Sequence, residues 1–283
     1  MAFILTLVNT TADLGTDLEE KATQFLREHG AEPGASRRFG RALDLPFSGA
    51  VIDPRLIPGD WNVDFAIQPA VFRHKRLLVS DMEMTLVQNE FLDDLAELAG
   101  VGEQVKAITA RAMNGEIDFA GSLRERLGLL EGKSTDLLEE AWKGMKLMPG
   151  AETLFGTLRA HGVRTVIVSG GFTFFVDRVK AILGADASFA NVLDLCDGRL
   201  TGSPKEPILG KEAKQQILEQ EAETLGLDLA ETMAVGDGAN DLPMLLRAGL
   251  GVAYHAKPKV ASAAACRVTH SDLTALLAFA GVG

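Results

Sequence analysis

The sequence predicts an α/β fold: a Rossmann-like, doubly wound parallel sheet, a helical cap inserted after its first core strand, and a small N-terminal α+β domain. Three observations predict it. Apolar, strand-like runs alternate with helical stretches from residue 76 onward, which is typical of a parallel sheet with helices on both faces. One long helical stretch without strands interrupts this alternation. The residues before 73 follow a different pattern, and a length of 283 residues suits two domains.

Residues 1–72 form the predicted N-terminal domain. The apolar run at 3–8 predicts a strand, residues 17–29 predict a helix, and the alternating run at 61–67 predicts another strand. The region between them holds prolines that predict loops: Pro33, Pro46, Pro54 and Pro58. The basic cluster at 73–76 predicts a solvated linker, so we place the domain boundary there.

Residues 73–283 form the predicted core. The continuous apolar run at 77–81 predicts a strand that is buried on both faces. The helical segments at about 88–146 predict the cap. Strands return at 163–169 and 232–236, and a hairpin turn is predicted at residues 196–199.

The composition excludes several classes of protein. Apolar residues make up 47% and charged residues 24%, which is ordinary for a globular chain. The 28 Lys and Arg against 39 Asp and Glu give a net charge of −11, so we expect no nucleic-acid partner. No basic residue precedes Lys21 and no apolar run reaches the ~18 residues of a membrane span, so we expect neither a secretory signal nor a membrane partner. Two cysteines suit a reducing compartment, and we expect a cytoplasmic protein.

Polar residues and glycines follow the ends of three predicted strands. They are the segments 81–85, 169–171 and 236–241, and Lys214 lies on the helix before the third strand. Because the carboxyl ends of parallel strands meet at one edge of a sheet, we expect these groups to lie together. Each has a simpler explanation on its own, as a helix cap, a tight turn or a solvated lysine. Their joint occurrence at successive strand ends favours a site.

Carboxylates that converge on one crevice repel each other unless a cation holds them. Hard oxygen ligands favour Mg²⁺, which usually serves phosphate chemistry. A carboxylate nucleophile, a hydroxyl with glycine amides, and a lysine would complete a site for phosphoryl transfer. The sequence therefore predicts an enzyme that cleaves a small phosphate monoester through an aspartyl-phosphate.

The same residues, in this order, resemble the haloacid dehalogenase superfamily, and within it the phosphoserine phosphatases of bacterial serine biosynthesis. The resemblance runs from about Lys75 to the C-terminus and includes residues 110–119, 147–150, 168–173 and 253–258. It implies a Mg²⁺-dependent phosphatase that hydrolyses O-phospho-L-serine to L-serine and phosphate, the last step of serine biosynthesis.

The resemblance also implies roles for single residues. Asp81 would be the nucleophile and Glu83 the general acid and base. The metal ligands would be Asp81, the backbone carbonyl of Glu83, and Asp237, with Asp241 in support. The phosphate would be bound by Ser169, Gly170 and Lys214. The rest of the substrate would contact Glu90 at its amino group, Arg126 at its carboxylate, and Met113, Phe119, Gly171 and Asn240.

Two positions depart from the family pattern. Glu83 stands where the family has Asp, and Met84 stands where it has a small hydroxyl residue. The extra methylene of Glu83 affects a step that needs heavy atoms about 2.6 to 3.2 Å apart. The departure leaves two alternatives open: a phosphotransferase that passes the phosphoryl group to an alcohol such as homoserine, or a catalytically impaired regulatory homologue. A homodimer and regulation by serine also stay open.

Overall fold

The computed structural model describes residues 1–282 of the chain. Its strands are β1 (Phe3–Val8), β2 (Ala31–Pro33), β3 (Arg37–Phe39), β4 (Ala42–Gly49), β5 (Asp64–Pro69), β6 (Leu77–Ser80), β7 (Arg164–Phe172), β8 (Ala187–Asn191), β9 (Leu193–Cys196), β10 (Arg199–Pro204), β11 (Thr232–Gly236), β12 (Leu250–Tyr254) and β13 (Cys266–Val268). Its α-helices are α1 (Leu18–Glu28), α2 (Phe91–Ala99), α3 (Gly102–Met113), α4 (Phe119–Gly128), α5 (Asp136–Lys143), α6 (Ala151–Ala160), α7 (Thr173–Leu183), α8 (Lys211–Thr224), α9 (Leu242–Arg247), α10 (Pro258–Ala263) and α11 (Ala275–Ala280). Short 3₁₀ turns lie at Pro54–Leu56, Gly59–Trp61, Ala70–Phe72 and Leu229–Glu231.

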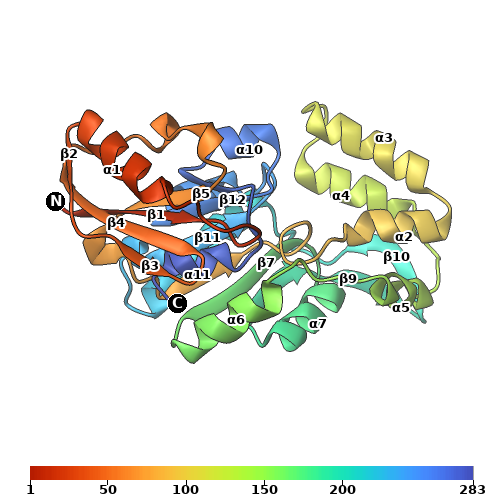
Figure 1. Cartoon of the computed structure of the whole chain (residues 1–283). Helices are drawn as coiled ribbons and strands as arrows, with labels where there is room; N and C mark the ends of the chain where they lie inside the picture. Colours follow the sequence, from red (N-terminus) through yellow and green to blue (C-terminus); the bar gives the residue numbers. More distant parts are fainter. Residues whose placement is uncertain (283) are drawn as a thin grey trace.

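Most strands of the described residues belong to one long sheet, ordered β2-β4-β1-β5-β13-β12-β11-β6-β7-β8, with β3 paired to β4 (Figure 1). The part from β13 to β8 is parallel throughout, as expected for a doubly wound fold. Within β6, Leu77 and Val79 pack in one apolar cluster while Leu78 packs in another. The central strand is therefore buried on both faces, which is why its sequence is continuously apolar.

The N-terminal part is an antiparallel sheet covered by α1. β1 pairs with both β4 and β5, and the predicted strand at 3–8 and helix at 17–29 are confirmed. The predicted loop region is wrong up to residue 49, because that part contains β2, β3 and β4, whereas residues 50–63, with Pro54 and Pro58, hold only loops and short 3₁₀ turns. Pro46 lies inside β4. On one side of β4, β3 pairs with residues 42–44 and β2 pairs with residues 47–49, so Pro46 falls in the gap between these two partner strands. On that side no neighbouring strand needs the N–H that proline lacks, so the strand tolerates it.

The basic cluster at 73–76 is only partly solvated, so the predicted exposed linker is wrong for two of its residues. Arg73 is buried and donates to the Phe279 carbonyl at 2.8 Å and to both Asp44 oxygens at 3.0 Å. Lys75 is buried and donates to the Ala230 carbonyl at 2.7 Å. Both side chains are covered by residues that come much later in the chain, near Ala230 and Phe279, and a local charge pattern does not reveal such contacts. The division at residue 72 stays a proposal about folding units, since β5 and β13 join both parts in one sheet.

Five helices, α2 to α6, lie between β6 and β7, and the first four of them, α2 to α5, fall within the stretch of about 88–146 for which the sequence predicts the cap. α3 and α4 form a lobe that stands apart from the sheet (Figure 1). The hairpin of β9 and β10 packs against α4. Its turn residues Asp197 and Gly198 both have positive φ, 48° and 72°, which confirms the predicted hairpin turn.

Candidate active site

The candidate site lies where the order of the parallel strands reverses. From β6 the chain continues outward to β7 and β8, and then returns to β11 on the opposite side of β6. Ligands bind at such a switch point, beyond the carboxyl ends of the strands. Asp81 follows β6 directly and Asp237 follows β11 directly, so the fold places both carboxylates there.

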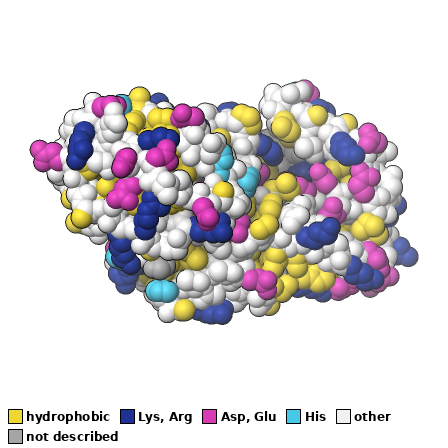
Figure 2. Space-filling view, in the orientation of Figure 1, with side chains coloured by type: hydrophobic (Ala, Val, Ile, Leu, Met, Phe, Trp, Pro, Cys, Tyr) yellow, Lys and Arg dark blue, Asp and Glu magenta, His cyan; other side chains and the backbone are white. Residues whose placement is uncertain are grey.

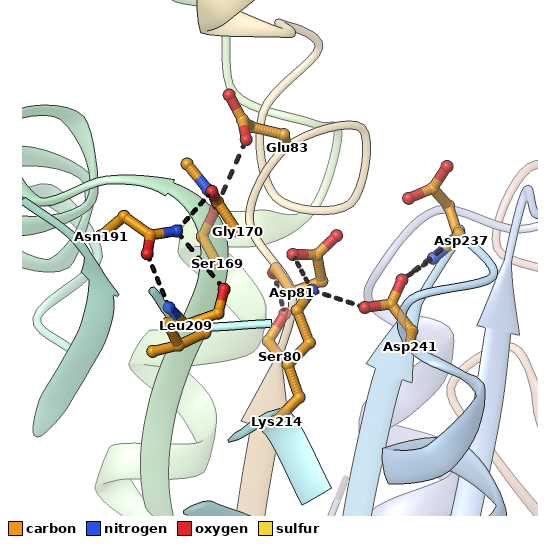
Figure 3. Close-up of polar contacts among 12 residues, drawn as sticks. Ser80, Asp81, Glu83, Ser169, Gly170, Asn191, Leu209, Lys214, Asp237 and Asp241 are labelled. Atoms are coloured by element: carbon orange, nitrogen blue, oxygen red, sulfur yellow. Dashed lines mark hydrogen bonds and ion pairs between the residues drawn. The ribbon is translucent and has the colours of Figure 1, made fainter. Parts of the chain in front are cut away.

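Asp81, Asp237 and Asp241 form a carboxylate cluster in which one oxygen from each lies within 4.8 Å of the others. Lys214 is buried and its Nζ lies 2.6 Å from an oxygen of Asp81 and 2.6 Å from an oxygen of Asp241 (Figure 3). The other Asp241 oxygen accepts the backbone N–H groups of Asp237 and Gly238, at 3.1 and 2.9 Å. Asp241 therefore holds both the loop at residues 237–238 and the Lys214 side chain in place.

Burial raises the pKa of Asp81 well above its usual range, the charge of Asp241 raises it further, and Lys214 opposes both. Burial alone would lower the pKa of Lys214, but the charges of Asp241 and Asp81 raise it overall. Burial also raises the pKa of Asp237, again with a contribution from Asp241. One lysine thus faces more negative charge than it can balance, and a second cation would relieve the remaining repulsion.

The donor set fits Mg²⁺. Carboxylate oxygens are the hard ligands that this ion prefers. Among the described residues the Asp237 carboxylate has no side-chain partner, and one oxygen of Asp81 is not used by Lys214. Asp81 and Asp237 could hold the ion, whereas the oxygens of Asp241 already accept hydrogen bonds.

The segment at the end of β7 forms a small cradle with Glu83. Ser169 Oγ accepts the Gly171 N–H at 2.9 Å and donates to Glu83 Oε2 at 3.4 Å (Figure 3). Glu83 Oε1 accepts the Phe91 N–H at 2.8 Å, at the first residue of α2. Burial raises the pKa of the Glu83 carboxyl, which favours its protonated form.

A cavity of about 730 Å³ opens between this cradle, the carboxylate cluster and the cap, and Figure 2 shows the surface hollowed beside the α3–α4 lobe. Sequence-predicted site residues that line it are Asp81, Glu83, Glu90, Met113, Phe119, Arg126, Gly170, Gly171, Asp237 and Asn240. The other predicted residues, Ser169, Lys214 and Asp241, are fully buried behind its wall.

The cap contributes charged groups to this cavity. Burial raises the pKa of Glu90 to about 8, with a further contribution from the charge of Glu83. Burial lowers the pKa of Arg126, although Asp93, Glu90 and Glu83 oppose this. Met113 is 74% exposed, so the apolar part of the cap is open to solvent here.

Three charged lining residues, Asp93, Lys257 and Lys259, have no assigned role in the sequence-based prediction. Asp93 lies one helical turn after Glu90, a spacing that could have indicated it. Lys257 falls within the segment 253–258 that carries the family resemblance, so that segment offered a signal.

Residues 75–249 match the family of haloacid dehalogenase-like hydrolases. The chain belongs to this family. A phosphoserine phosphatase of Haemophilus influenzae is 47% identical over 201 residues, which cover 71% of this chain and 64% of that protein. The chain thus spans less than two thirds of the length of this relative. A phosphoserine phosphatase of Lactococcus lactis is 44% identical over 205 residues, which cover 72% of this chain and 95% of that protein.

The structure of a probable phosphoserine phosphatase from Vibrio cholerae resembles this haloacid dehalogenase-like hydrolase along its whole length. The TM-score is 0.80 at 33% identity, and the match covers 99% of this chain and 86% of that one. The likeness therefore includes the N-terminal sheet as well as the parallel core. Among residues 1–282, no helix is both long enough and apolar enough to cross a membrane.

Proposed function

We propose that this hydrolase is a Mg²⁺-dependent phosphoserine phosphatase. The observation that carries the proposal is the cavity itself: Asp81 lies in its wall at a strand end, and Glu90 and Arg126 line it from the cap. A carboxylate and a guanidinium suit the ammonium and carboxylate groups of an amino acid, and the planar guanidinium matches a planar carboxylate. The relatives named phosphoserine phosphatase support the same substrate.

In the first proposed step, a carboxylate oxygen of Asp81 attacks the phosphorus of phosphoserine. The bond from phosphorus to the serine oxygen breaks, and Glu83 donates its proton to that oxygen, so serine leaves. In the second step, water attacks the phosphorus of the aspartyl-phosphate while Glu83 accepts a proton. The bond from phosphorus to the Asp81 oxygen breaks, so phosphate leaves and the Asp81 carboxylate is restored, as expected for covalent catalysis with one acid–base group.

The surrounding residues would orient and stabilise the phosphoryl group. Ser169, the glycine amides at 170–171 and Lys214 would contact its oxygens, and Asp81, Asp237 and the Glu83 carbonyl would hold Mg²⁺. A bound Mg²⁺ would offset negative charge that develops on the phosphoryl oxygens. Lys214 also keeps Asp81 in place before substrate arrives, through its 2.6 Å contact.

Substrate preference tests the proposal. We expect the Mg²⁺-loaded enzyme to hydrolyse O-phospho-L-serine with a kcat/KM at least about 10²-fold above that for O-phosphoethanolamine, which lacks the carboxylate. Arg126→Met should remove most of that difference, because the loss of a buried charged contact costs about 2–3 kcal/mol. Equal kcat/KM for both substrates in the unmodified enzyme would contradict the proposed substrate.

A parallel reaction with added homoserine tests the acceptor. If water is the acceptor, homoserine leaves the rate of phosphate release unchanged and no phosphohomoserine forms. Accumulation of phosphohomoserine would identify a phosphotransferase instead.

A further inference from the structure

The candidate phosphate cradle lies at an irregularity in the sheet. Val168 of β7 pairs with Phe189 of β8, and the next pair is Phe172 with Asn191, so β7 advances four residues while β8 advances two. The segment 169–171 therefore bulges out of the ladder. A buried carbonyl in such a bulge has lost its partner strand and needs another hydrogen-bond donor.

The Asn191 side chain supplies that donor. Asn191 is only 2% exposed, and its Nδ2 donates to the Gly170 carbonyl at 2.8 Å (Figure 3). Nδ2 also lies 3.4 Å from the Leu209 carbonyl, and Oδ1 accepts the Leu209 N–H at 2.7 Å. One amide thus fastens the bulge to the segment that leads into α8.

The contacts of Asn191 with Gly170 and with Leu209 both lead to groups that we propose to bind phosphate. In a trans peptide the carbonyl and the following N–H point in opposite directions, so holding the Gly170 carbonyl aims the Gly171 N–H. That N–H is the group that contacts Ser169 Oγ at 2.9 Å. On the other side, Leu209 lies two residues before α8 begins at Lys211, and α8 is the helix that carries Lys214.

We propose that Asn191 is a positioning residue, which sets the Ser169–Gly171 cradle against Lys214 so that both meet the same phosphoryl group. The proposal rests on the proposed function, since it deepens the account of that site. Asn191 lines no part of the cavity described above and acts only through the backbone groups it holds.

Asn191→Asp tests this with little change in shape, because it places an oxygen where Nδ2 now faces the Gly170 carbonyl. We expect inhibition by inorganic phosphate of the Mg²⁺-loaded enzyme to weaken at least about tenfold, the effect of losing about 1.4 kcal/mol. We also expect kcat to fall more than KM rises. Asn9→Asp is the matched control, since Asn9 is buried directly after β1 in the N-terminal part and its amide likewise bridges backbone groups.

The result that overturns the proposal is a variant that melts at a lower temperature but keeps its affinity for inorganic phosphate, as the control should. If Asn191→Asp does not fold, Asn191→Ser is measured in the same way, and unchanged phosphate affinity there would also overturn it. Phosphate affinity, followed by calorimetry, can be compared even if phosphoserine is not a substrate. A failure of the proposed function is thereby distinguished from a failure of this inference.

Discussion

The Glu83 side chain is one methylene longer than the Asp that the family resemblance leads us to expect at this position. The longer side chain fits because Gly171 faces it: a Cβ at residue 171 would lie 2.6 Å from Glu83 Oε2. The carboxylate is also held by the Phe91 N–H at 2.8 Å. The extra methylene therefore need not misplace the acid, which favours an active enzyme over an impaired homologue.

Substitution of Glu83 separates its proton chemistry from its length. Glu83→Gln should lower kcat about 10²- to 10⁴-fold, because an amide cannot exchange the proton. Glu83→Asp should change kcat by less than about tenfold, since it keeps the carboxyl group. Steady-state phosphate release measures both. A rise of several orders of magnitude in Glu83→Asp would show that the natural residue impairs the enzyme.

Gly171 should not tolerate a methyl group. Gly171→Ala should push the Glu83 carboxylate aside and lower kcat at least about tenfold, with a small effect on folding because the displaced atoms end a flexible side chain. Gly156→Ala is the control: Gly156 lies in α6, where a Cβ would meet nothing within 4 Å. An unchanged kcat in Gly171→Ala would mean that Glu83 does not work from this position.

Among the helices, strands and turns, the sequence correctly predicts those that depend on a local residue pattern. The helices of the cap, β6, β11 and the hairpin turn follow from periodicity and turn residues, and the structure confirms them. Pro46 in β4 and the buried Arg73 and Lys75 contradict local rules, because partners distant in sequence decide their surroundings. The proposed role of Asn191 could not be predicted for the same reason, since a lone Asn at a strand end carries no signal until the bulge beside it is known.

Lys75, just before β6, should make stability depend on pH. Burial lowers its pKa from 10.5 to about 8, with the charge of Arg73 adding to the effect. Between these values the unfolded chain binds more protons than the folded one, so the free energy of unfolding should rise with pH through that window. Below pH 8 the full cost of burying the charge is present.

Lys75→Met lacks this titration. From pH 7.5 to 10, the free energy of unfolding of the unmodified protein should gain about 2 kcal/mol relative to Lys75→Met. Urea unfolding of both proteins at the two pH values measures the difference. A constant difference would contradict a buried, charged Lys75.

For the whole molecule, the net charge of −11 would suggest poor affinity for an anionic substrate. The site offsets part of that charge locally, because Lys214 pairs with two of the three clustered carboxylates and Arg126, Lys257 and Lys259 line the cavity, and a bound Mg²⁺ would offset more of it. The positions of Asp81 and Asp237 follow from motifs at strand ends, so the meeting of their carboxylates could be predicted, whereas their roles stay a proposal. The charge balance around them depends on burial, which only the structure reveals.

Removal of metal should therefore lower the melting temperature of the protein without unfolding it at room temperature. An ion that binds only the folded state adds about 2.7 kcal/mol at a hundredfold excess over its Kd, so Mg²⁺ should raise the melting temperature by a few degrees and EDTA should reverse the gain. Lys214 keeps the metal-free cluster partly balanced. Differential scanning calorimetry measures the shift, and identical melting in Mg²⁺ and EDTA would argue against an ion at this cluster.

In the proposed reaction, Asp81 carries the phosphoryl group during hydrolysis of phosphoserine. The most direct measurement is release of inorganic phosphate from O-phospho-L-serine with Mg²⁺, compared between the unmodified protein and Asp81→Asn. We predict steady turnover by the first and a rate at least about 10³-fold lower for the second. Equal rates, or no release by the unmodified protein, would contradict the account.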